Sequence, residues 1–134
     1  MKQLETNGAI FIVRPNGIIE AHKNPNWDQP DTPETVRQYA LKLKEVIGND
    51  VYGLLTFAPS LYVKKETLEA FASVKVGNVA GAVLVSSVGS KIFANFALKF
   101  IKTPIPKKIF TKQAEAEKWL LEHIEYAKQK RNKS

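Results

Sequence analysis

The clearest pattern of apolar and polar positions lies between Val79 and Phe100. An unbroken apolar run, residues 80–85, is followed by the polar stretch Ser86–Ser90 and then by apolar residues at helical spacing. The run predicts a strand buried on both faces, because no polar residue marks a solvent side. Apolar residues at positions i, i+1, i+4, i+5 and i+8 from Ile92 predict one face of a helix. This strand–loop–helix unit is typical of a parallel α/β sheet, and its polar loop lies where such folds usually carry their sites.

Similar patterns elsewhere predict that strands and helices alternate in the order ββαβαβαβα. A strand rich in β-formers, Gly8–Arg14, is joined to Ile18–His22 by the turn Pro15–Gly17, which predicts an antiparallel hairpin. A helix is expected from Thr32-Pro33-Glu34, where Asp31 or Thr32 can cap it. We therefore expect an α/β fold with a mixed sheet opened by an antiparallel hairpin and covered by four helices.

The other expected elements follow the same reasoning. The first helix is predicted to end at residues 48–50, and a second helix to span residues 62–74. A third helix is expected after Ser87, and a fourth after a cap at Thr111. Two further strands are predicted at residues 51–58 and 108–110. The first helix is expected to bury Val36, Tyr39, Ala40, Leu43, Val46 and Ile47, and the last to bury Ala114, Trp119, Leu120, Ile124 and Ala127.

Composition narrows the class of protein. The 134 residues suit a single domain over residues 1–134, and 44% hydrophobic residues suffice for one core. No apolar run approaches the ~20 residues of a membrane span, and the N-terminus lacks a signal-peptide pattern. Cysteine is absent, which excludes disulfides and thiolate chemistry. These features predict a cytoplasmic protein.

The formal net charge of +7 arises in the second half of the chain. From Leu68 onward there are twelve Lys or Arg and five Asp or Glu, so 12 − 5 = +7, whereas the charges before Leu68 cancel. A flexible basic tail is expected at about residues 128–134. This basic excess, in the tail and in the lysines from Lys99 to Lys112, could form a surface for nucleic acid, anionic lipid or an acidic protein. A solvated face with a frayed tail is favoured, because no aromatic residues interleave with the tail lysines, and no specific nucleic-acid partner is predicted.

Candidate catalytic residues are few. The only histidines are His22 and His123, and neither belongs to a set with metal-ligand spacing. Nucleophile-elbow and Walker motifs are absent, so no catalytic residue, metal or cofactor is predicted. Asp28 and Asp31 could form a carboxylate pair, but loop solvation and helix capping explain them better.

The polar loop after the buried strand is the candidate binding site. Hydroxyls and backbone N–H groups at a helix N-terminus favour an anion, because the dipole and the donors point the same way. A contribution from Ser60 is expected at the same edge of the sheet. Alternatively, Ser87 only caps the helix and Gly89 only permits a turn. The predicted ligand- or anion-binding residues are Ser60, Ser86, Ser87, Gly89, Ser90 and Lys91.

The helix after this loop is the candidate interface. Phe93, Phe96 and Phe100 carry more apolar surface than one core needs, which predicts a dimer seam or a ligand pocket. Core packing explains these residues equally well. Ser60, between a strand and a helix, is also a candidate phosphate acceptor, with an ordinary turn serine as the alternative.

A moderately specific pattern closes the chain: Ala82–Ser87, then Pro104-Ile105-Pro106, Ile109-Phe110-Thr111 and Ala114–Leu120. With the element order over about residues 8–125, it resembles the STAS-like group of small bacterial proteins. The chain is similar to anti-sigma-factor antagonists, and more closely to their uncharacterised bacterial relatives, often grouped with the Sec14-like fold. In such antagonists a partner kinase phosphorylates a serine at a helix start. Ser60 occupies a similar place, although Pro59 stands where the family pattern has Asp.

The resemblance implies a non-enzymatic regulatory module that binds a protein partner or a small ligand. We expect protein–protein interaction with homodimerisation. The alternative is a small-molecule or lipid carrier, with a pocket near Ser60 and the Ser86–Ser90 loop. An enzyme that uses His22, Asp28 or the serines is the least favoured possibility, because no base–nucleophile–orienter set is present.

Overall fold

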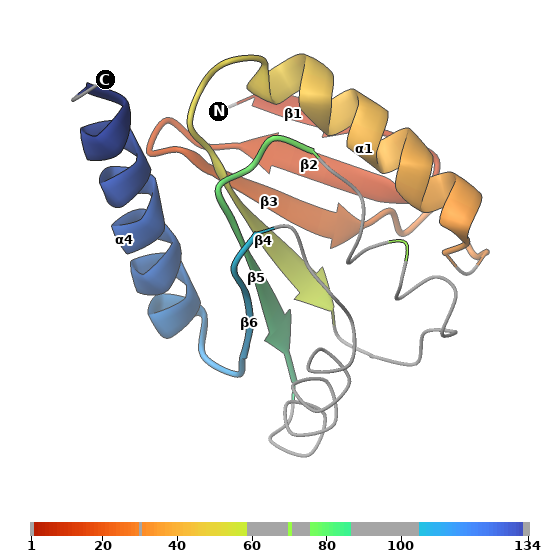
Figure 1. The fold of residues 1–134 in the computed structure, drawn as a ribbon. Helices are drawn as coiled ribbons and strands as arrows, with labels where there is room; N and C mark the ends of the chain where they lie inside the picture. The colour runs from red at the N-terminus through yellow and green to blue at the C-terminus, as the bar shows by residue number, and fades with distance from the viewer. Residues whose placement is uncertain (1, 30, 59–69, 71–75, 87–104, 133–134) are drawn as a thin grey trace.

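The fold is built on one six-stranded mixed sheet (Figure 1). The computed structural model describes residues 2–29, 31–58, 70, 76–86 and 105–132. The strands lie in the sheet in sequence order, from β1 to β6. Their bounds are β1 Lys2–Glu5, β2 Ala9–Val13, β3 Ile18–Lys23, β4 Gly53–Ala58, β5 Ala80–Val85 and β6 Lys107–Phe110. The helices that lie within the described residues are α1 Pro33–Ile47 and α4 Gln113–Asn132.

The sheet has an antiparallel half and a parallel half. Strands β1, β2 and β3 pair antiparallel, and β3, β4, β5 and β6 pair parallel. The expected turn between β2 and β3 is present: Gly17 has φ 94°, and the Ile18 N–H donates to Asn16 Oδ1 at 3.1 Å. The predicted α/β class, the mixed sheet and the antiparallel pairing of β2 with β3 are therefore confirmed. The expected order ββαβαβαβα was wrong at its start, because β1 precedes this hairpin and pairs with β2.

Strand β1 was not predicted. Its sequence, KQLE, contains one apolar residue, so no alternating pattern marks it. The strand pairs with β2 along its whole length, and Leu4 packs against the core on the α1 side of the sheet. The strand is defined by its pairing with β2 and by the contact of one side chain with the core. Both depend on residues elsewhere in the chain, so the local sequence does not predict the strand.

Helix α1 covers one face of the sheet. Thr32 caps it, as one of the two predicted alternatives, in a reciprocal capping box with Thr35. Five of its six predicted inward residues are buried, and Val46 is partly buried. On this side the core contains Ala9, Phe11, Ile19, Ala21, Tyr39, Ala40, Leu43, Ile47 and Val76.

Helix α4 covers the opposite face of the sheet. Alternate residues of a strand point to opposite sides, so Ile19 of β3 belongs to the core under α1 and Ile18 to the core under α4. Its buried residues are Ala116, Leu120 and Ile124. A Cβ added to Gly53 would lie 3.1 Å from Leu120 Cδ2, so the glycine allows the helix to pack closely on β4. The core on this side contains Ile18, Leu55, Ala80, Ala82, Phe110, Ala116, Leu120 and Ile124.

Three expectations for α4 were wrong in detail. The helix begins at Gln113, and the Ala116 N–H donates to the carbonyl of Lys112, which places the cap one residue after Thr111. Ala114 is exposed and Ala116 is buried, so the expected stripe was out of phase at its start. The helix also runs to Asn132, into the segment expected to be a flexible tail from about residue 128.

The other two expected helices lie mostly outside the described residues. Of residues 62–74, only Ala70 is described, and it is helical. The predicted helix that carries Phe93, Phe96 and Phe100 lies wholly outside.

Candidate functional site

One half of the sheet face on the α4 side is only partly covered. The described core residues under α4 come from β3, β4, β5, β6 and α4 itself, and none comes from β1 or β2. Pairing of Ile12 with Glu20 and of Ile10 with His22 places these side chains on this same face. Ile10, Ile12 and His22 are each partly exposed. We call this surface the open sheet face; its residues are Gln3, Glu5, Ile10, Ile12, Glu20, His22 and Phe57.

A row of charged side chains joins this face to α4. Arg14 donates from Nε to Glu20 Oε2 at 2.6 Å and from Nη1 to Glu117 Oε1 at 2.5 Å. Gln113 Nε2 donates to Glu117 Oε2 at 2.9 Å, and His22 Nε2 lies 2.7 Å from Glu20 Oε1. We call Arg14, Glu20, His22 and Glu117 the ion row. It links β3, the end of β2 and the first turns of α4.

The ion row keeps its carboxylates charged. The Arg14 side chain is 17% exposed and that of Glu20 is 14% exposed. Burial would raise the pKa of Glu20, but hydrogen bonds from His22 and Arg14 and the Arg14 charge outweigh it and lower that pKa. The hydrogen bond from Arg14 lowers the pKa of Glu117 against a smaller effect of burial. Burial opposes the charge on Arg14, and the two glutamates outweigh burial and raise its pKa.

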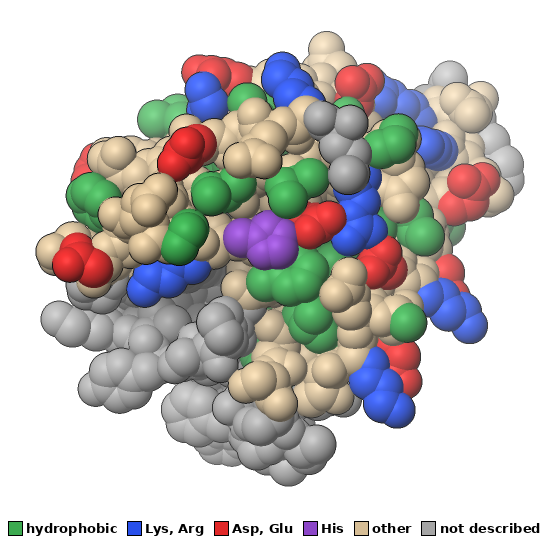
Figure 2. Space-filling view, turned by 180° about the vertical axis from the view of Figure 1, so that it is seen from behind, with side chains coloured by type: hydrophobic (Ala, Val, Ile, Leu, Met, Phe, Trp, Pro, Cys, Tyr) green, Lys and Arg blue, Asp and Glu red, His purple; other side chains and the backbone are tan. Residues whose placement is uncertain are grey.

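His22 is held at the end of this row. Its ring stacks on Phe57, with ring centroids 4.2 Å apart and an angle of 15° between the planes. The contact with Glu20 uses Nε2 and orients the imidazole, whose side chain is 34% exposed. Figure 2 shows a histidine near the middle of this face, with acidic and basic side chains beside it and hydrophobic side chains around it.

A histidine oriented by a carboxylate has the chemistry of a general base or of a metal ligand. Among the described residues, no group of three or more His, Cys, Asp or Glu could hold a metal ion. The described partners of His22 are a carboxylate and an aromatic ring. The geometry gives a partly exposed surface of mixed charge and apolar character, on which hydrogen bonds orient Glu20 and His22.

The predicted binding loop lies almost entirely outside the described residues. Ser86 is described, lies exposed directly after β5, and makes a contact of its own. Ser60, Ser87, Gly89, Ser90 and Lys91 lie outside, as do the interface residues Phe93, Phe96 and Phe100. These assignments stay predictions.

Sequence reasoning missed the ion row. Arg14 and Glu117 are 103 positions apart, so no local pattern links them. A weaker signal was present, because Glu20 and His22 alternate with the apolar residues Ile19 and Ala21 in a strand. This alternation puts two ionisable groups on one face.

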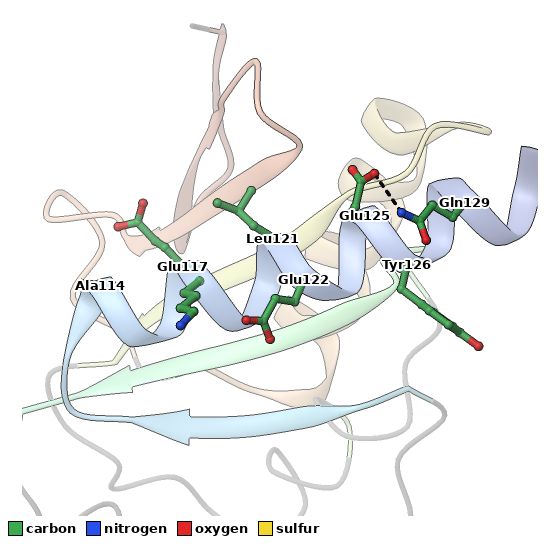
Figure 3. Close-up of a pocket in the computed structure, with 8 residues that line it drawn as sticks. Ala114, Glu117, Leu121, Glu122, Glu125, Tyr126 and Gln129 are labelled. Carbon is green, nitrogen blue, oxygen red and sulfur yellow. Dashed lines mark hydrogen bonds between the residues drawn. The ribbon is translucent and has the colours of Figure 1, made fainter.

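The outer side of α4 carries a shallow groove of about 790 Å³ (Figure 3). Glu117, Leu121 and Glu125 point from one side of the helix, and Glu122 and Tyr126 point from the other. Leu121 is 38% exposed and Tyr126 is 66% exposed. The residues that line the groove are Ala114, Glu117, Lys118, Leu121, Glu122, Glu125, Tyr126 and Gln129.

A family model described as "Domain of unknown function (DUF7793)" matches residues 13–124. The chain belongs to the DUF7793 family. The DUF7793 match includes the whole ion row and most of α4, and ends before the last turns of that helix. A comparison with curated proteins found no match.

One solved structure similar to this DUF7793 chain is a protein of unknown function from Arthrobacter sp. FB24. It is 20% identical, over 87% of this chain and 95% of that chain, with a TM-score of 0.30. The predicted STAS-like membership is untested by these matches. Among the described helices, none is long and apolar enough to cross a membrane.

Proposed function

We propose that this DUF7793 domain is a non-enzymatic binding module that acts through protein–protein contacts and forms a homodimer. The observation that carries the proposal is the open sheet face. Helix α4 covers the β3–β6 part of its side of the sheet, and the partly exposed side chains of Ile10 and Ile12 on β2 lie beyond it. Phe57 on β4 packs against the core beneath α4 and is also partly exposed.

The composition of this face supports a protein partner. Core residues of protein interfaces are apolar and aromatic, with few but well-placed charges. Here Ile12 and Phe57 flank Glu20 and His22, which the ion row holds in fixed positions. A preorganised surface loses little side-chain entropy on binding. The resemblance to STAS-like proteins also supports a regulatory role over a catalytic one.

The test is the oligomeric state of purified protein, measured by sedimentation velocity and native mass spectrometry. The expected result is a species of twice 15.0 kDa. Ile12→Asp should shift it to the monomer, because a carboxylate would enter the apolar part of the contact. Circular dichroism checks that the variant keeps its fold.

Leu41→Asp is the matched control. Leu41 is 65% exposed on α1, away from the open sheet face, so its substitution should leave the dimer intact. A wild-type protein that is monomeric at every concentration contradicts the proposal. A dimer that Leu41→Asp disrupts and Ile12→Asp does not would place the interface on α1. A reproducible added mass of a few hundred daltons, by rough estimate for a drug-sized ligand, would favour the small-molecule or lipid carrier.

A further inference from the structure

The open sheet face has a charge opposite to that of the whole chain. Together with the ion row it carries Glu5, Glu20 and Glu117 against Arg14, which gives 1 − 3 = −2 with His22 neutral. The chain as a whole has a formal net charge of +7. Glu5 is exposed on the edge strand β1, so a partner can reach its carboxylate. The face therefore favours a cationic partner.

The last turns of α4 carry a cationic and aromatic pair. Tyr126 is 66% exposed, and Lys130 is exposed one turn further along the helix. Residues four apart lie on the same side of a helix, so the ring and the ammonium form one surface. Lys128 lies elsewhere on the helix, where it lines a hollow of about 360 Å³ with Asp50 and Tyr52.

We propose that the partner on the open sheet face is the Tyr126–Lys130 surface of a second copy of this chain. In this arrangement Tyr126 packs against Ile10, Ile12 and Phe57, and Lys130 meets the acidic group that includes Glu5. The contact is reciprocal, so a two-fold axis generates it twice and closes the dimer. This inference rests on the proposed function and specifies its interface.

Complementary chemistry supports this choice of occupant. Exposed tyrosines are typical anchors of interfaces, because they bury much area at low entropic cost. Within the described residues, the exposed large hydrophobic side chains are Leu41, Leu121 and Tyr126, and two of these three lie on α4. The same helix supplies the opposite charge at Lys130.

Charge reversal and mixing test the contact. Glu5→Lys and Lys130→Glu should each weaken the dimer at least about tenfold, because each sets like charges opposite one another at both contacts. An equimolar mixture of the two variants should form a heterodimer of wild-type affinity, since both contacts then join opposite charges. Sedimentation velocity measures the affinities, and native mass spectrometry of one isotope-labelled variant identifies the heterodimer.

Matched variants separate this contact from other effects. Lys128→Glu makes the same charge change elsewhere on α4 and should leave the dimer affinity unchanged. Glu5 accepts a hydrogen bond from Asn24 Nδ2 at 2.9 Å, so Glu5→Lys can perturb the fold. Glu5→Gln keeps an acceptor oxygen while removing the charge, and it should still weaken the dimer. Tyr126→Ala should weaken it as well, whereas Leu41→Ala should not.

The outcomes distinguish the two proposals. A monomeric wild-type protein overturns both. A wild-type dimer that tolerates Glu5→Gln, Lys130→Glu and Tyr126→Ala overturns this inference and leaves the proposed function standing. Single variants that dissociate, but whose mixture forms no heterodimer, also overturn it, because the two charges are then not partners.

Discussion

At the scale of single residues, Arg14 is the centre of the described polar interactions. Its guanidinium joins two glutamates from different elements, Glu20 on β3 and Glu117 on α4. All three side chains are partly buried, so water screens these charges less than it screens an exposed ion pair. Loss of one member leaves the others without their partner in a poorly solvated place.

Arg14→Met should therefore lower the free energy of unfolding by about 1–3 kcal/mol, because it leaves two carboxylates without their donor. Urea denaturation measures this change. The control is Arg37→Met, which removes an exposed pair with Glu34 whose side chains are 62% and 67% exposed. That variant should stay within about 0.5 kcal/mol of the wild type. Equal effects of the two substitutions would show that burial of the ion row adds nothing.

Stability should fall in acid through the carboxylates of the ion row. Glu20 and Glu117 have pKa values below the ordinary 4.5, so near and below that pH the folded chain binds fewer protons than the unfolded chain. Their contribution is present above the unfolded pKa and is lost as pH falls through the folded pKa.

Between about pH 6 and about pH 3, the midpoint of urea unfolding should fall less steeply in the double variant Glu20→Gln with Glu117→Gln than in the wild type. Glu34→Gln with Glu45→Gln removes two exposed carboxylates of α1 and should keep the wild-type slope. Parallel curves for the ion-row variant and the wild type would rule out this source of acid sensitivity.

At the scale of elements, prediction succeeded where the pattern is local. The capping residue, proline start and apolar stripe of α1 all lie within its own sequence. The predicted cap of α4 was wrong by one position, because Thr111 and Lys112 can both precede the first turn. Strand β1 escaped detection since it has one inward apolar residue, Leu4. Such edge elements are specified by their partner strand more than by their own composition.

A single narrow stripe of buried apolar side chains should hold helix α4 against the sheet. Substitution of two neighbouring leucines, one buried and one exposed, tests this. Leu120 is fully buried and Leu121 is 38% exposed. Leu120→Ala should lower the free energy of unfolding by about 2–5 kcal/mol, because it opens a cavity beneath the helix. Leu121→Ala should cost less than about 1 kcal/mol. Similar values from chemical denaturation would mean that α4 is not packed in this phase.

At the scale of the whole molecule, the sequence could predict the class of fold but not the surface it exposes. Buried runs such as residues 80–85 indicate strands of a mixed sheet, since burial on both faces leaves a continuous apolar pattern. The open sheet face depends on how far α4 extends across that sheet, which no local pattern records. The ion row depends on the same placement, because α4 brings Glu117 to Arg14.

The order of the strands has a consequence for synthesis on the ribosome. Each strand of the sheet neighbours the next one along the chain, so the sheet can add strands in the order in which they emerge. Helix α4 follows all six strands in the sequence, yet it packs back on β3, β4 and β5. The nascent chain should therefore expose Ile18, Leu55 and Ala82 until α4 leaves the exit tunnel. Chaperone binding during translation should be strongest in that interval, when a sheet is already paired and one of its apolar faces is still bare.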